Sequence, residues 1–158
     1  MSATVFAFES DFAGSLRCIP MAVRLKLDLV GIKLTLRQWS QLQREQRAEL
    51  LETEFSGVAD REAYRRLVEA MLVAVGGEVE RIDAVDGSAW SETADVPAVV
   101  TCQSADKNVT APTPGQWRHL TDVQRFALIK LTRPGHENEN FVPAMQEFGL
   151  LQSPNSVD

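Results

Sequence analysis

The alternation of apolar and polar positions is clearest in the middle of the chain, in DREAYRRLVEAMLVAVGG at residues 60–77. Apolar side chains recur there at intervals of three and four, which places them on one face of an α-helix. They are Tyr64, Leu67, Val68, Met71, Leu72 and Val75. Asp60 is the expected N-cap, and Gly76 and Gly77 are expected to end the helix. The pattern therefore predicts a long amphipathic helix.

Two stretches on either side of this helix share a sequence. Residues 38–50 read QWSQLQREQRAEL and residues 116–128 read QWRHLTDVQRFAL, with six of thirteen positions identical in the same order. Each begins inside a capping box, formed by Thr35 with the first glutamine and by Thr113 with the second. In such a box the hydroxyl and the glutamine side chain bind backbone amides at the start of a helix. Each stretch is therefore predicted to form a short helix, a corner and a second helix.

The similarity continues upstream, with IPMAV before the first stretch and VPAVV before the second. Pro20 and Pro97 are 77 positions apart and the matching tryptophans are 78 apart, so a loop differs by one residue. We therefore predict two helix–turn–helix units, at about residues 19–55 and 96–133, with the amphipathic helix between them. Either unit alone would expose an apolar face, so the two are expected to pack together.

A single compact domain is the simplest organisation, because a chain of 158 residues can bury roughly 68–70% of its unfolded surface. We expect an all-α domain over residues 1–150, with no sheet of more than two short strands. Residues 151–158 are expected to be a disordered tail. The acidic stretch 78–95 has no periodicity, and it is either a surface loop held by Trp90 or a linker.

The residues that the two stretches share favour a structural interpretation. Trp39 and Trp117 are expected to anchor the core rather than to contact a ligand. Arg47 and Arg125 each lie one turn into the second helix of a unit. There a guanidinium is more often bound by a carboxylate or by the carbonyls of a neighbouring helix end than by a ligand. The repetition therefore predicts a structural role for these shared residues rather than a ligand-binding one.

The net charge of −6 is distributed unevenly along the chain. Residues 17–47 hold seven basic and two acidic residues, a sum of +5, whereas residues 48–106 hold four basic and thirteen acidic residues, a sum of −9. The distribution fits either two solvated faces that attract each other or a basic patch for an acidic partner. Arg24 and Lys33 belong to that basic stretch. An acid-rich second helix in the first unit argues against binding of nucleic acid.

Several classes of protein are excluded by what the sequence lacks. No apolar run approaches the roughly 20 residues of a membrane span, and the N-terminus has no positively charged leader pattern. Cys18 and Cys102 have no metal-like spacing and are expected to be reduced thiols. These features predict a cytoplasmic protein with no membrane association.

Recognisable catalytic motifs such as GxSxG, a P-loop, HExxH or CxxC are missing from the sequence. The richest polar segment is GHENENF at residues 135–141. Its simplest role is to cap the final helix, with Asn138 or Asn140 as the N-cap. As an alternative, Cys18, His136 and Glu137 could supply three metal ligands if they fold together.

Two blocks of the sequence resemble the signature blocks of the nitrate reductase associated protein family. They are SLRCIPMAVRLKLDLVGIKLTLRQW at residues 15–39 and QRFALIKLTRPGHENENFVPAMQEFGL at residues 124–150. The resemblance implies a cytoplasmic, non-enzymatic accessory or maturation factor that binds assimilatory nitrate reductase, and it implies no defined catalytic site. We expect no catalytic residue, no metal and no cofactor. The positions that match are Arg17, Cys18, Pro20, His136, Glu137, Asn138, Asn140 and Phe141.

Residues from the two blocks and from the basic stretch together form the expected partner-binding set. Its members are Arg17, Cys18, Arg24, Lys33, His136, Glu137, Asn138 and Asn140. The competing hypothesis is a helical protein that binds a small ligand or a metal in the Cys18/His136 region.

Overall fold

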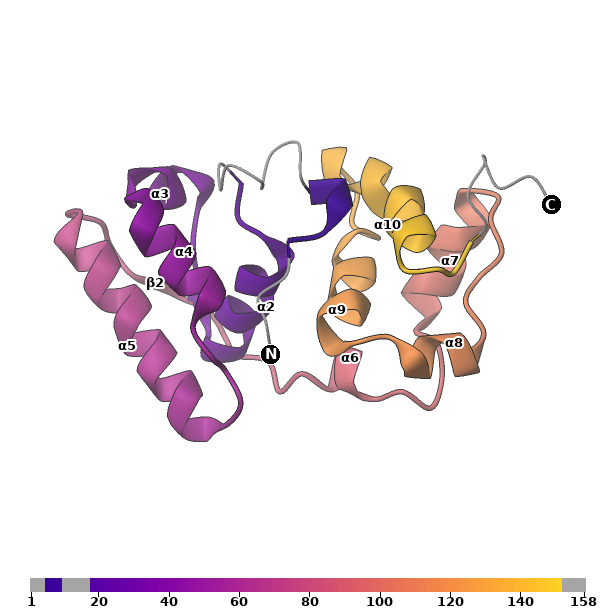
Figure 1. Ribbon diagram of the computed structural model, residues 1–158, viewed down its shortest axis with the longest axis horizontal. Coiled ribbons are helices and arrows are strands. Elements are labelled where there is room, and N and C mark those ends of the chain that lie inside the picture. Colours follow the sequence, from indigo (N-terminus) through magenta and orange to yellow (C-terminus); the bar gives the residue numbers. More distant parts are fainter. Residues whose placement is uncertain (1–4, 10–17, 152–158) are drawn as a thin grey trace. The chain divides into compact units, whose positions relative to one another are not determined.

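The computed structural model describes residues 5–9 and 18–151, and it is mostly helical. The chain divides into two compact units, which we call unit 1 (Met1–Asp86) and unit 2 (Gly87–Asp158). Figure 1 shows unit 1 in indigo to magenta and unit 2 in pink to yellow. The expectation of a predominantly helical protein is confirmed. A single domain over residues 1–150 stays a prediction.

Unit 1 packs three helices around one core. Its elements are η1 (Ala7–Glu9), α2 (Met21–Val30), β1 (Ile32–Lys33), α3 (Leu36–Gln41), α4 (Arg44–Glu52), α5 (Val58–Ala74) and β2 (Glu80–Arg81). Helix α2 packs against α4 and α5, and α4 packs against α5. Trp39, Leu50, Tyr64 and Leu72 are fully buried. Tyr64 and Leu72 belong to the apolar face that the helical periodicity predicts, and Trp39 is buried as expected for a core anchor.

The only sheet within the described residues consists of two short antiparallel strands, in agreement with the expected limit. Strands β1 and β2 pair with Ile32 opposite Arg81 and Lys33 opposite Glu80. Gly31 precedes β1 in a left-handed conformation, with a φ of 77°. A Cβ at Gly31 would lie 2.7 Å from the carbonyl oxygen of Ile82. This close approach requires glycine, which has no Cβ.

Helix α5 begins earlier than the sequence indicates. Gly57 is the N-cap, so the prediction that Asp60 caps this helix is wrong. Asp60 is the third residue of α5, and its carboxylate accepts hydrogen bonds from the backbone N–H and the hydroxyl of Ser56, at 2.9 and 2.8 Å. From this position the carboxylate binds the residue that precedes the helix. Its negative charge also interacts favourably with the positive end of the helix dipole.

Unit 2 is built around α9. Its elements are α6 (Ser88–Ser91), α7 (Ala98–Asp106), α8 (Pro114–His119), α9 (Asp122–Lys130), η2 (His136–Asn140) and α10 (Phe141–Glu147). Helix α9 packs against α6, α7 and α10. Trp117, Phe126, Phe141 and Met145 are fully buried. Unit 2 therefore has a core of its own.

The aperiodic stretch 78–95 contains regular structure at both ends. Backbone N–H groups of Ile82 and Val85 donate to carbonyl oxygens at the C-terminal end of α2, at 2.9 and 3.1 Å. Further along, Trp90 is buried in unit 2 and packs edge-on against Phe126, with ring centroids 5.0 Å apart. Trp90 therefore holds the second half of the stretch in unit 2, as in one of the two alternatives expected. The boundary between the two units falls between the two anchored parts.

The ends of the chain are described only in part. Of the expected disordered tail at 151–158, residues 152–158 lie outside the described residues, as does the segment 10–17. Among the helices of the described part, none is long and apolar enough to cross a membrane.

Candidate functional site

The capping boxes that the sequence predicts are present in both units. Thr35 Oγ1 accepts from the N–H of Gln38 at 3.1 Å, and Gln38 Oε1 accepts from the N–H of Thr35 at 3.0 Å. Thr113 and Gln116 form the same pair of bonds at 3.1 and 2.9 Å. A third box, at Thr121, starts α9. These bonds satisfy amides that a helix start leaves without a partner.

After the first short helix, Arg47 closes the corner between α3 and α4. Its Nε donates to the carbonyl oxygens of Trp39 and Leu42, each at 3.1 Å, and a terminal nitrogen donates to that of Ser40 at 3.1 Å. These carbonyls belong to the C-terminal end of α3. We call residues 35–47, which contain this arrangement, the α3–α4 corner.

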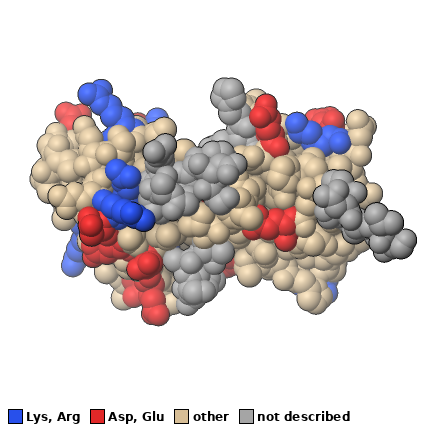
Figure 2. All heavy atoms as spheres, turned by 45° about the horizontal axis from the view of Figure 1, so that its top comes forward, with Lys and Arg blue, Asp and Glu red and all other residues tan. Residues whose placement is uncertain are grey.

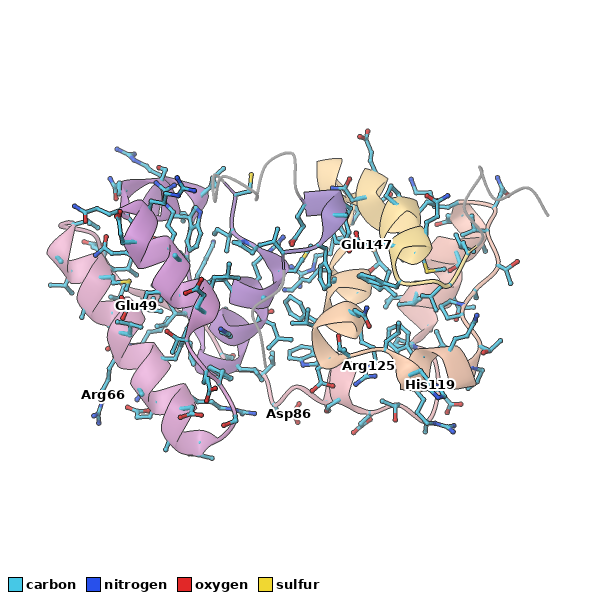
Figure 3. The ribbon with its side chains drawn as sticks, in the orientation of Figure 1. Glu49, Arg66, Asp86, His119, Arg125 and Glu147 are labelled. Carbon is cyan, nitrogen blue, oxygen red and sulfur yellow. The ribbon has the colours of Figure 1, made fainter. Side chains whose placement is uncertain are left out.

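Arg125 closes the corresponding corner of unit 2, which comprises residues 113–125 and is called the α8–α9 corner. This arginine is only 5% exposed. Its guanidinium donates to the carbonyl oxygens of Trp90, Trp117, Arg118 and Leu120 and to the carboxylate of Asp122. Figure 3 shows Arg125 inside unit 2. Of the two kinds of acceptor expected, a carboxylate or the carbonyls of a helix end, Arg47 binds carbonyls and Arg125 binds both.

Lys26 belongs to the basic stretch but lies against protein rather than open solvent. Its ammonium donates to three carbonyl oxygens at the C-terminal end of α4, those of Leu50 (3.4 Å), Leu51 (2.9 Å) and Thr53 (2.7 Å). Burial lowers the pKa of Lys26. Nearby, the hydroxyl of Tyr64 donates to the carbonyl oxygen of Leu50 at 2.8 Å, and burial raises the pKa of Tyr64. Lys26 thus neutralises a helix end.

The other cations of the basic stretch differ in their exposure. Arg24 is half-buried, with a guanidinium nitrogen 4.0 Å from the sulfur of Met21. Lys33 Nζ lies 3.9 Å from Glu80, in a pair whose side chains are both more than half exposed. Such a pair adds little stability. Sequence reasoning named both residues as partner-binding, and that assignment stays a prediction.

Arg37 and Arg44 are exposed on the α3–α4 corner, and sequence reasoning did not single them out. Within the described part of the chain, neither side chain forms an ion pair. Figure 2 shows Lys and Arg side chains gathered over the part of unit 1 where α3 and α4 lie, with acidic side chains further down the same unit. A charge pattern along the sequence cannot separate these cations from Lys26 or Arg47, whose acceptors are backbone carbonyls.

The expected Cys18/His136 region is only partly described. Arg17 and the side chains of His136 and Glu137 lie outside the described residues. Cys18 is a half-buried free thiol of unit 1, while the backbone of His136 belongs to η2 of unit 2. Their proximity stays a prediction. Among the side chains that are described, no three His, Cys, Asp or Glu residues are placed to hold a metal ion.

The two asparagines of the polar segment have different positions. Asn138 Nδ2 donates to the carbonyl oxygens of Leu131 at 3.1 Å and Arg133 at 3.4 Å, which follow the last turn of α9. Asn140 occupies the N-cap position of α10, as one of the two alternatives expected, although its side chain makes no capping hydrogen bond. At least one residue of the expected partner-binding set therefore stabilises the fold.

Comparison with known protein families identifies the family of this chain. A family model described as conserved nitrate reductase-associated protein matches residues 5–148 of the chain. The match includes most of both units, the whole of the block at residues 15–39 and all but the last two residues of the block at 124–150. Neither the curated proteins nor the solved structures gave a match.

Proposed function

Because the chain belongs to the conserved nitrate reductase-associated protein family, we propose that it is an accessory factor that binds assimilatory nitrate reductase. In this role it is not itself catalytic, and it acts in the cytoplasm to bring the reductase to full activity or to keep it active. The observation that carries the proposal is the family match over residues 5–148. The exposed cations of unit 1 support it, because charge complementarity speeds docking and selects partners.

Deletion of this protein tests the proposal directly. The deletion strain should contain the nitrate reductase polypeptide but show low enzyme activity. It should fail to grow on nitrate and should grow normally on ammonium. Expression of the full chain from a plasmid should restore both phenotypes. Full nitrate reductase activity in the deletion strain would show that the proposal is wrong.

Direct binding and metal analysis separate this role from binding of a small ligand or metal. The tagged protein should retain nitrate reductase from nitrate-grown cells. Purified protein should contain no stoichiometric iron or zinc, and Cys18→Ser should leave its metal content unchanged. Stoichiometric metal that is lost in Cys18→Ser or in His136→Ala would instead support a metal-binding protein.

We also propose that residues 19–55 and 96–133 are repeat units that arose by duplication. Each has a proline N-cap, at Pro20 or Pro97, a helix, and then a residue with positive φ, Gly31 or Asn108. A capping box, a short helix, an extended leucine and a second helix follow in both. Superposition of the two backbones in an experimental structure would test this.

A further inference from the structure

The first residues of α4 and α9 differ in charge, although the two corners share their hydrogen bonds. Arg44 begins α4 and Asp122 begins α9, 78 positions later. Asp122 forms an ion pair with Arg125 three residues further on. In unit 1 the same spacing places Arg44 near Arg47. Unit 2 therefore has an attractive pair where unit 1 has two cations.

Arg44 is unfavourable for the stability of unit 1. A cation in the first turn of a helix opposes the helix dipole, and two like charges three residues apart repel each other. Glu45 is the acidic residue in the first turn of α4, and it is exposed. Folding alone would favour an acidic residue at position 44, as in unit 2. The presence of arginine indicates a requirement other than folding.

A second exposed arginine occupies the same corner. Arg37 is the second residue of α3, where a cation also opposes the dipole, and the matching position in unit 2 is Gly115. Lys33 lies just before the corner, and its single described ion pair is long and exposed. Three cations thus belong to or precede the corner in unit 1, and two of them have no described acidic partner.

We propose that Arg37 and Arg44, the exposed arginines of the α3–α4 corner, bind carboxylates of the nitrate reductase polypeptide together with Lys33. A guanidinium presents paired donors that fit a carboxylate, which makes arginine well suited to this binding. Three cations on a chain with a net charge of −6 are too few to bind the phosphates of a nucleic acid. This inference depends on the function proposed above, and it specifies the surface and the chemistry of the partner.

The test uses one substitution for which stability and binding should change in opposite directions. Arg44→Asp gives the α3–α4 corner the pair that Asp122 and Arg125 form, so the midpoint of thermal unfolding should rise. The same substitution should weaken binding to purified nitrate reductase. The double variant Arg37→Glu with Arg44→Asp should lose about tenfold or more in affinity at low salt, and less at high salt, because exposed charges are screened. Binding is measured by biolayer interferometry on the full chain.

Arg118→Glu is the control for the single variant Arg44→Asp, because each replaces one exposed arginine of a corner by an acidic residue. It should change the affinity by less than about twofold. Equal losses for Arg118→Glu and for Arg44→Asp would overturn the inference, since they would reflect net charge alone. So would unchanged binding by the double variant, or a fall in the unfolding midpoint of Arg44→Asp. If wild-type protein does not bind the reductase at all, the proposed function fails. If wild type binds and the double variant binds equally well, only the inference fails.

Discussion

The α3–α4 and α8–α9 corners have the same backbone hydrogen bonds but different surroundings. In both, an arginine binds three carbonyl oxygens of the preceding short helix. Arg125 is almost completely buried and also binds Trp90 and Asp122, whereas Arg47 is half-buried. The α8–α9 corner is therefore held within a core by its arginine. The α3–α4 corner has the same hydrogen bonds to backbone carbonyls, with exposed cations beside them.

The side chains that bind the C-terminal carbonyls of α4 and α9 also differ between the two units. The last carbonyls of α4 accept from Lys26, a residue of α2. The carbonyls after α9 accept from Asn138, a residue of η2. Position 103, which is 77 residues after Lys26, holds a buried glutamine whose Nε2 has no hydrogen-bond partner among the described residues. A shared local sequence therefore leads to similar helices, while the long-range partners of those helices differ.

The largest expected loss of stability comes from replacing the buried tryptophan that each corner contains. Trp39→Ala and Trp117→Ala should each lower the free energy of unfolding by about 3–5 kcal/mol, because both indoles are fully buried. Urea denaturation followed by circular dichroism measures the loss. Val58→Ala is the control, since that side chain is 84% exposed and should matter little. A negligible loss for one tryptophan alone would show that the two corners are not equivalent.

A smaller effect should separate the two arginines. Arg125→Met should cost about 3 kcal/mol, because it leaves buried carbonyl oxygens without a donor, and Arg47→Met should cost about 1 kcal/mol. The same denaturation experiment compares them. Equal costs would contradict the conclusion that burial distinguishes the corners.

Alkaline pH should affect unit 1 through Tyr64, the single tyrosine of the chain. Burial raises the pKa of Tyr64, so the folded protein keeps a proton that the unfolded chain releases above pH 10. The free energy of unfolding should therefore fall by up to about 1.4 kcal/mol for each pH unit above 10.

Lys26 changes the free energy of unfolding in the opposite direction, and it does so at lower pH. Burial lowers its pKa, so the folded protein binds fewer protons than the unfolded chain between that lowered pKa and 10.5. The contribution of Lys26 to the free energy of unfolding therefore rises with pH in this range.

Denaturation of wild type and of Tyr64→Phe between pH 9 and pH 11.5 isolates the effect of the tyrosine. The variant should lack the fall in the free energy of unfolding at alkaline pH. An equal fall in the variant would exclude Tyr64 as the cause.

The smallest effect concerns the helix starts. Thr35→Ala and Thr113→Ala should each lower the free energy of unfolding by about 1 kcal/mol, because each removes one N-cap hydrogen bond. Thr→Ser at either position should retain most of the stability, since serine also supplies the hydroxyl. A loss confined to one of the two alanine variants would contradict the equivalence of the two caps.

The sequence predicts those features whose causes are local. A capping box depends on two residues three positions apart, and each Thr-x-x-Gln motif forms its box. Asp60 shows the limit of such local reasoning, because a side chain suited to an N-cap also binds backbone from the third position of a helix. Helix α6 is too short for any periodicity, so only the buried Trp90 marks it.

The availability of charged residues for a site is harder to predict. The acceptors of Lys26 lie 24–27 residues away, and nothing in the local sequence indicates them. Arg37 has the same charge and no described ionic partner. The sequence therefore predicts the sign of the charge in this region, and only tertiary structure shows which cations a partner could contact.

The placement of the tryptophans gives each unit its own optical signal. Trp39 is the indole of unit 1, whereas Trp90 and Trp117 belong to unit 2, and all three are buried in the folded protein. Fluorescence of a Trp39→Phe variant reports on unit 2, and that of a double variant with Phe at positions 90 and 117 reports on unit 1. If the two emission transitions coincide along a denaturant gradient, the units unfold as one cooperative body. Separate midpoints would show that each unit melts independently.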